Sequence, residues 1–282
     1  MKRGIFLFIL LLSLGLVGVA ITAQPQFKVG ILSDDNLPQE GIQQLADQIA
    51  KKHFGQEEGR VIVFKSVDDL LESKESVSLF IGGLAPALKF EKASQGKAIA
   101  ESDETISSSI IATQSSGIKN IKDLKGYVVG VGNPNDTTGF FLPFIFLLKE
   151  GFTFRLLPKP GLTPPPRDIG LLKIPSSKDR ETRFRMGRIP AIALDSKTAK
   201  GVEGRVLYVS PPAPKVVAVK SSTFPDAAVE DVKNFLFSFG APIEPTKKPA
   251  SVEEQPPTEL GFKFVPLKTW GGWKSQFETY NP

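Results

Sequence analysis

The stretch GNPNDTTGFFLPFIFLLKEG, residues 132–151, joins a turn rich in Gly, Asn, Asp and Thr to a long apolar helical run. The strand-like segment YVVGVG (127–132) precedes it, so the turn is expected at the end of a buried strand. The first amide groups of a helix have no partner within the helix, and the helix dipole favours negative charge there. The turn therefore has two interpretations: it only ends a strand and caps a helix, or it holds a ligand at the helix N-terminus.

Strands and helices are expected to alternate on both sides of this stretch. Before it, short apolar runs typical of buried strands are FKVGIL (27–32), RVIVFK (60–65) and VSLFIGG (77–83). After it come IPAIALDS (189–196), the paired runs within 206–220, and an amphipathic helix over 224–240. Helical segments separate most of these runs, and that alternation predicts an α/β fold with mostly parallel sheets flanked by helices.

Residues 1–23 have the pattern of a signal peptide. Lys2 and Arg3 precede a long apolar run, and the small residues Ala20 and Ala23 are candidate cleavage positions. The alternative is an uncleaved anchor, because the apolar run is just long enough to span a bilayer. Either way the folded body is expected in the periplasm or elsewhere outside the cytoplasm, with membrane contact only through this segment if it stays uncleaved.

Composition excludes several classes of protein. The 282 residues include no cysteine and one histidine, which argues against disulfides, a transition-metal site and histidine- or cysteine-based catalysis. The formal net charge is only +5, so nucleic-acid binding is not expected. The one dense basic run, RETRFRMGR (180–188), is expected to be a solvated helix face, with an anion clamp as the alternative.

The block SGIKNIKDLKGYVVGVGNPNDTTGFFLPFIFLLKEGF (116–152) resembles the phosphate/phosphonate-type periplasmic substrate-binding proteins of ABC transporters. This resemblance implies the two-lobed type II binding-protein fold, with a ligand held between two α/β lobes. The chain would cross between lobes near 110–114 and 203–210. The implied first lobe comprises 27–110 plus 206–282, which includes a Pro-rich insertion at 241–257, and the second lobe comprises 115–202.

The resemblance also implies a ligand site at the turn, formed by Asp136, Thr137, Thr138 and Gly139. The family usually has Ser-Thr-Ser-Gly there, so Asp136 replaces a hydroxyl by a carboxylate. Two unit charges 4 Å apart at an effective dielectric of about 20 repel by roughly 4 kcal/mol. Asp136 therefore either only caps the helix or faces a ligand group that is positive or donates a hydrogen bond.

Other candidate contacts flank the implied cleft. Ser115 and Ser116 precede the second-lobe helix, where a turn with a helix cap is the alternative interpretation. Gly83 lies in GGLAP (82–86), a strand-to-helix turn with free amide groups. The histidine and the acidic residue that the family carries in its second lobe are missing, and Asp195 is only a distant candidate for the acid.

The functional hypothesis is an extracytoplasmic solute-binding protein that delivers a small solute to a membrane permease. A phosphate- or phosphonate-like solute is one candidate. The alternative is a non-catalytic interaction module that keeps the fold but has a degenerate cleft. An enzyme is the weakest hypothesis, and no catalytic residue, cofactor or metal is expected. The aromatic tail with Trp270 and Trp273 is expected to pack onto the body.

Overall fold

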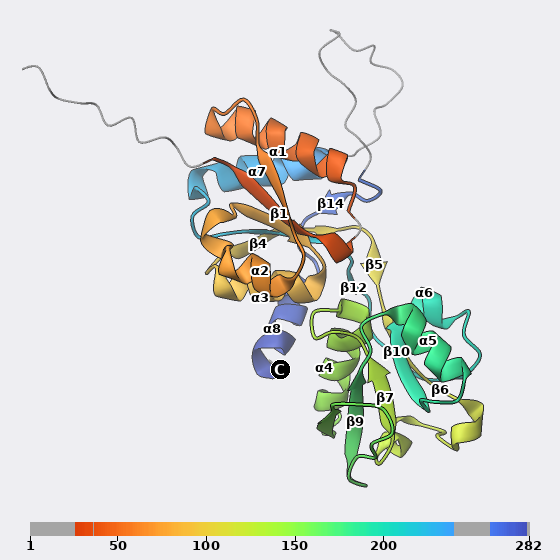
Figure 1. The fold of residues 1–282 in the computed structure, drawn as a ribbon. Coiled ribbons are helices and arrows are strands. Elements are labelled where there is room, and N and C mark those ends of the chain that lie inside the picture. The colour runs from red at the N-terminus through yellow and green to blue at the C-terminus, as the bar shows by residue number, and fades with distance from the viewer. Residues whose placement is uncertain (1–25, 36, 240–259, 281–282) are drawn as a thin grey trace, which may run out of the picture.

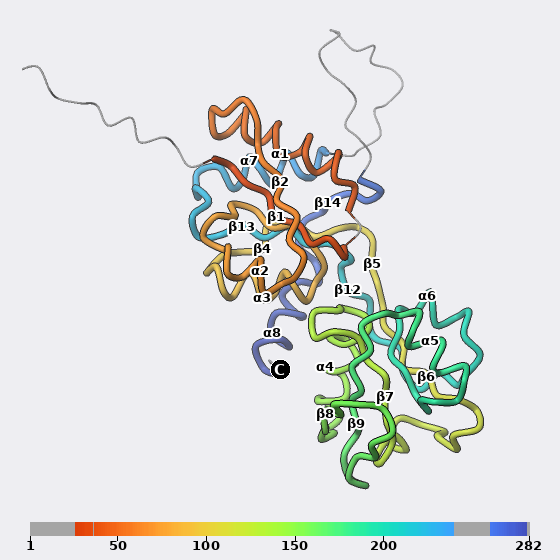
Figure 2. The backbone as a smooth tube through the Cα atoms, in the orientation of Figure 1, coloured from red at the N-terminus to blue at the C-terminus, as the bar shows by residue number. Residues whose placement is uncertain are grey.

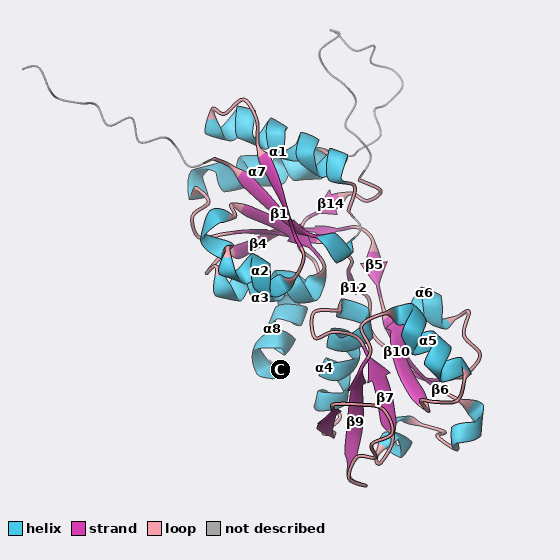
Figure 3. Cartoon of the chain, viewed as in Figure 1, coloured by secondary structure: helices cyan, strands magenta, loops and turns pink. Residues whose placement is uncertain are grey.

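The computed structural model describes residues 26–35, 37–239 and 260–280. These residues form two α/β units, each built on a six-stranded sheet (Figure 1, Figure 3). The predicted signal segment and the Pro-rich insertion at 241–257 lie outside the described residues. Across the described ranges, no helix has both the length and the apolar character needed to cross a bilayer.

The first sheet has the strand order β14-β4-β13-β3-β1-β2. Its strands are β1 (Lys28–Leu32), β2 (Arg60–Phe64), β3 (Leu79–Gly82), β4 (Lys97–Ser102), β13 (Val217–Lys220) and β14 (Phe264–Val265). Strand β1 pairs in parallel with β2 and β3, whereas β13 runs antiparallel to β3 and β4. The central strands are apolar along their length because helices cover both faces of the sheet.

Five helices cover the two faces of the first sheet. One face carries α1 (Gln39–Phe54) and α7 (Val229–Ser238), and the other carries α2 (Val67–Glu72), α3 (Leu84–Ala93) and α8 (Trp270–Tyr280). Helix α1 follows Pro38 and buries Ile42, Leu45 and Ile49 at helical spacing. It ends before Gly55, which has a left-handed backbone conformation that glycine adopts without strain.

The second sheet has the order β11-β6-β10-β7-β9-β8. Its strands are β6 (Ser108–Ala112), β7 (Val128–Val131), β8 (Thr153–Leu157), β9 (Asp168–Lys173), β10 (Ala191–Asp195) and β11 (Arg205–Val209), with helices α4 (Leu142–Lys149), α5 (Ser177–Arg185) and α6 (Ser196–Ala199). Strands β7 to β10 are parallel, and β6 is antiparallel to its neighbours. The predicted fold class, an α/β protein with two mostly parallel sheets, is confirmed.

Strand β9 was not expected from the sequence. The proline-rich segment 158–167 connects β8 to β9 without a helix, although the two strands are parallel. The connection between two parallel strands normally contains a helix. Because no helical pattern lies between β8 and β9, the sequence contained no indication of a second parallel strand. The second-lobe helix expected after Ser115 and Ser116 is only a short 3₁₀ turn, Ile121–Leu124, capped reciprocally by Asn120 and Asp123.

Two short strands join the sheets. Strands β5 (Thr105–Ile106) and β12 (Ala213–Pro214) pair with each other, and Figure 2 shows the chain passing between the two units through them. The crossings expected near 110–114 and 203–210 are therefore displaced. Strand β6 is buried along its length and pairs with both β10 and β11, so both expected crossings fall on strands of the second sheet.

The C-terminal helix packs where the two units meet. Helix α8 buries Trp270, Trp273 and Phe277, as predicted for the aromatic tail. These side chains belong to the same apolar cluster as Phe141 and Ile145 at the start of α4. An apolar contact therefore connects the units on one side.

Candidate functional site

A cavity of about 890 Å³ lies between the two sheets. Its lining includes residues that follow β1, β2, β3, β7 and β9 within two positions, which places it at the carboxyl ends of parallel strands in both units. Ligands of α/β proteins bind at such edges. A smaller cavity of about 680 Å³, between α4, α8 and residues 208–212, lies away from these strand ends. The larger cavity is therefore the candidate site, called here the cleft.

The cleft is polar and nearly balanced in charge. Four lysines and four aspartates line it: Lys65, Lys89, Lys173 and Lys215, with Asp34, Asp35, Asp68 and Asp136. Lys215 forms an ion pair with Glu104 at 2.6 Å. Burial lowers the pKa of Lys89, and the nearby Asp68 carboxylate partly opposes that effect. This lining suits a small polar ligand better than an apolar one.

Backbone hydrogen bonds within the turn after β7 hold its conformation. The Gly132 amide donates to the Gly139 carbonyl at 2.9 Å, and the Asp136 amide donates to the Asn133 carbonyl at 2.8 Å. Residues Thr137–Phe141 then form a π-helical turn that leads into α4. The amides of Phe140 and Phe141 both donate to the Asp136 carbonyl.

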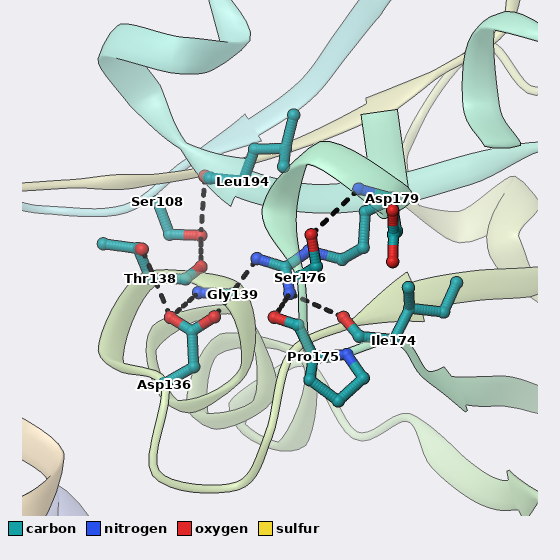
Figure 4. Close-up of polar contacts among 10 residues, drawn as sticks. Ser108, Asp136, Thr138, Gly139, Ile174, Pro175, Ser176, Asp179 and Leu194 are labelled. Carbon is teal, nitrogen blue, oxygen red and sulfur yellow. Dashed lines mark hydrogen bonds and ion pairs between the residues drawn. The ribbon is translucent and has the colours of Figure 1, made fainter. Parts of the chain in front are cut away.

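The Asp136 side chain caps this turn (Figure 4). Its Oδ1 accepts a hydrogen bond from the Gly139 amide at 2.7 Å, and its Oδ2 pairs with Arg180 Nη2 at 3.1 Å. Of the two interpretations of the turn, capping applies to Gly139, whose amide is not free for a ligand. Its amide is taken because a carboxylate three residues earlier has the reach and charge to cap it.

Arg180 was expected to be solvent-exposed, and this prediction is wrong. The run RETRFRMGR was expected to be a solvated face, yet the Arg180 side chain is only 2% exposed. Its Nη1 donates to the carbonyls of Ile174 and Pro175, while Nη2 holds Asp136. Position 180 lies on the inner face of α5 together with Phe184, so helical spacing from that aromatic residue could have identified it.

The hydroxyl groups of the turn are engaged within the protein. Thr137 Oγ1 accepts a hydrogen bond from the Ala85 amide in the first turn of α3, at 3.2 Å. Thr138 Oγ1 donates to Asp136 Oδ1 at 3.4 Å. A second bond across the cleft joins Lys89 Nζ to Asn135 Oδ1 at 2.6 Å. Two hydrogen bonds within the protein thus link the turn to α3 across the cleft.

Gly83 faces the cleft at the start of α3, as predicted, but its amide is also occupied. It donates to Asp35 Oδ2 at 3.2 Å. Burial raises the pKa of Asp35 to about 6; the hydrogen bond from Gly83 opposes this shift, and the neighbouring charge of Asp34 adds to it. Asp35 was not predicted as a site residue, although its position just after a buried parallel strand is a usable signal.

The remaining candidates lie elsewhere or serve local structure. In the register of β6 and β10, Ala112 pairs with Ala191, so residues 113–116 leave β6 at the edge opposite the turn. Ser115 and Ser116 do not line the cleft, and Ser116 Oγ bonds the Thr113 carbonyl and the Ile118 amide. Asp195 caps α6 through the Lys197 and Thr198 amides. The structure therefore brings together only Gly83 and the 136–139 turn.

Comparison with known families supports the resemblance seen in the sequence. The family model described as "ABC transporter, phosphonate, periplasmic substrate-binding protein" matches residues 38–163, which include Gly83 and the whole turn. The resemblance to this transport family is thereby confirmed. A search of curated proteins finds no significant match.

Solved structures with the same fold include binding proteins of known ligand. The protein XAC2383 from Xanthomonas citri, solved with ATP, superposes with a TM-score of 0.74 at 15% identity, covering 91% of this chain and 98% of its own. PhnD1 from Prochlorococcus marinus, in complex with methylphosphonate, gives a TM-score of 0.56 at 12% identity over 91% and 98%. At these identities the match establishes the two-lobed fold and leaves the ligand of this chain open.

Proposed function

We propose that this chain, whose residues 38–163 match a family of ABC-transporter substrate-binding proteins, is the extracytoplasmic solute-binding component of an uptake system. The observation that carries the proposal is the polar cleft of about 890 Å³ at the carboxyl ends of strands in both units. A small solute would bind there, and a membrane permease would recognise the loaded, closed form. A phosphate- or phosphonate-like solute is one candidate class.

In this proposal, each lobe is built on one of the two sheets. The first lobe comprises residues 27–106 with 213–282, and the second comprises 108–209, joined through β5 and β12. Closure would turn one lobe against the other about these two connections. Residues 1–23 would direct the chain out of the cytoplasm as a cleaved signal peptide or hold it at the membrane as an anchor.

The proposed site on the second lobe is the turn with Asp136, Thr137, Thr138 and Gly139, and Gly83 faces it from the first lobe. All of these except Gly139 line the cleft. The expectation that the chain is not an enzyme stays a prediction, consistent with the transport family that it matches. The interaction-module alternative is less favoured, because that family and the polar cleft both point to a small solute.

Thermal unfolding of the mature protein with a panel of solutes tests this function. The panel contains phosphate, methylphosphonate, 2-aminoethylphosphonate, amino acids, polyamines and ATP. A ligand at one hundred times its Kd stabilises the folded protein by about 2.7 kcal/mol, which raises the unfolding midpoint by several degrees. We expect such a rise with at least one small polar solute, together with a smaller radius of gyration in solution.

A blocked cleft provides the control. Asn135→Trp adds a large side chain to the cleft wall and is expected to abolish the ligand-dependent rise. Leu162→Trp, in the exposed proline-rich segment, is expected to preserve it. A rise that survives Asn135→Trp would place binding outside the cleft. A flat response of the wild-type protein across the panel would favour the interaction module.

A further inference from the structure

The carboxylate of Asp136 occupies the position that a ligand anion would take at this helix start. Both of its oxygens are engaged, one by the Gly139 amide and the other by the buried guanidinium of Arg180. An amide at a helix start and a buried guanidinium together favour an oxyanion. Here the chain supplies that oxyanion itself.

The surrounding backbone is shaped for this internal ion pair. A β-carbon at Gly132 or at Gly139 would overlap the Asp136 carboxylate, and one at Gly139 would also overlap the Arg180 guanidinium. These two glycines therefore make room for the carboxylate and its partner. The glycine that the sequence analysis expected to admit a ligand admits Asp136 instead.

The charges of Asp136 and Arg180 determine which ligand groups are favoured at this helix start. Arg180 is neutralised by Asp136, and its Nη1 is committed to the carbonyls of Ile174 and Pro175. The Asp136 carboxylate alone would repel a ligand oxyanion about 4 Å away by the equivalent of about a thousandfold in affinity, at an effective dielectric of about 20. The Arg180 charge lies behind the carboxylate, farther from the ligand, and offsets only part of this repulsion. A solute with a neutral or cationic polar group at this end meets no such repulsion.

We propose that Asp136 is the specificity-determining residue of the cleft: it acts as a resident anion that excludes ligand oxyanions from the α4 end, and Arg180 positions it. The inference rests on the proposed function, since it assigns a ligand class to the same cleft. The solute would be a small neutral or cationic polar molecule, or one whose anionic group is directed away from this turn.

The variant Asp136→Ser tests this inference. Serine retains a capping hydroxyl, removes the charge and frees the Arg180 guanidinium. Calorimetric titration with methylphosphonate and with inorganic phosphate should show weak or undetectable binding to the wild-type protein. The same titrations should show a gain of about a hundred- to a thousandfold in the variant. Phosphate should also raise the thermal midpoint of the variant more than that of the wild-type protein.

Three further variants make the result specific. Asp68→Ser removes the same charge from the opposite wall and should show no comparable gain, because it opens no position beside a buried guanidinium. The double variant Asp136→Ser/Arg180→Met should lose the gain. If Asp136→Ser does not fold, Asp136→Asn preserves the shape and the hydrogen bond from Gly139 and should gain about tenfold.

The outcomes separate this inference from the proposed function. A folded Asp136→Ser protein with no gain, or an equal gain in Asp68→Ser, overturns the inference. Tight binding of methylphosphonate to the wild-type protein that weakens in Asp136→Ser also overturns it, while the transport function stands. A wild-type protein that binds no solute, together with a clear gain in Asp136→Ser, supports the inference and counts against the transport function.

Discussion

At the start of α3 the Asp35 carboxylate accepts a hydrogen bond from the Gly83 amide, and at the start of the π-helical turn the Asp136 carboxylate accepts one from Gly139. The two helix starts face each other across the cleft, and Thr137 Oγ1 joins them by accepting from the Ala85 amide. At each helix start, a carboxylate of the protein thus accepts a hydrogen bond from an amide that could otherwise bind a ligand anion.

The two carboxylates differ in how their charge is compensated. Asp136 is paired with the buried guanidinium of Arg180. In the described part of the chain no cationic group forms an ion pair with Asp35, and burial raises its pKa to about 6. One helix start therefore carries a carboxylate held in an ion pair, whereas the other carries a carboxyl group without such a partner and with a pKa of about 6. The following predictions test this difference, beginning with the largest effect.

Removing the counter-ion of Asp136 should have the largest effect on stability. Arg180→Met retains most of the buried volume but leaves the carboxylate without its cation, which typically costs about 3–5 kcal/mol. Urea denaturation should show the free energy of unfolding lowered by this amount. The double variant Asp136→Asn/Arg180→Met leaves no unpaired charge and should recover most of the loss. Equal stability of Arg180→Met and the wild-type protein would show that the ion pair is not formed.

Replacement of glycine by alanine should lower the free energy of unfolding by different amounts at the two helix starts. A β-carbon at Gly139 would overlap the Asp136 carboxylate and the Arg180 guanidinium, whereas one at Gly83 would lie 3.3 Å from Asp35 Oδ1 and 3.4 Å from Thr137 Oγ1. Gly139→Ala should therefore cost about 2–3 kcal/mol, in the range of overpacked sites, and Gly83→Ala well under 1 kcal/mol. Urea denaturation of both variants gives the comparison, and equal losses would contradict it.

The sequence predicted the parts of the fold that depend on local patterns. Apolar runs such as 27–32 and 77–83 contain buried strands, because strand burial is encoded within a few residues. The run at 60–65, also expected to be buried, is an edge strand on which Val63 is exposed. The turn at 132–139 was likewise recognised from its own residues. The position of the crossings was not, because it depends on β6 and β11 pairing, which are about a hundred residues apart in sequence.

The electrostatics of the cleft could not be predicted for the same reason. Capping by Asp136 was one of two interpretations of the sequence, but its partner Arg180 comes from a different helix 44 residues later. Asp35 reaches Gly83 across 48 residues, and Lys89 reaches Asn135 across 46. A sequence pattern shows that a charge is present, while only the folded chain shows which charge neutralises it. The sign of the local potential, on which ligand class depends, therefore came from the structure alone.

The last prediction concerns Asp35 and depends on pH. Its pKa is raised from 3.8 to about 6, so the folded protein holds this proton more tightly than the unfolded chain. The resulting stabilisation is fully present below pH 3.8 and is lost as the pH rises through about 6. Such a shift corresponds to at most about 3 kcal/mol, and the partial solvent access of this side chain reduces it to about 1–2 kcal/mol.

Asp35→Asn removes the titration and retains an oxygen that can accept the Gly83 hydrogen bond. Relative to the wild-type protein, the variant should have nearly the same stability at pH 4 and be about 1–2 kcal/mol more stable at pH 7. Urea denaturation at intervals between these values measures the difference, and Asp68→Asn serves as the control for loss of an exposed cleft carboxylate. A difference that stays constant with pH would mean that Asp35 is compensated as fully as Asp136. The two helix starts would then be electrostatically equivalent.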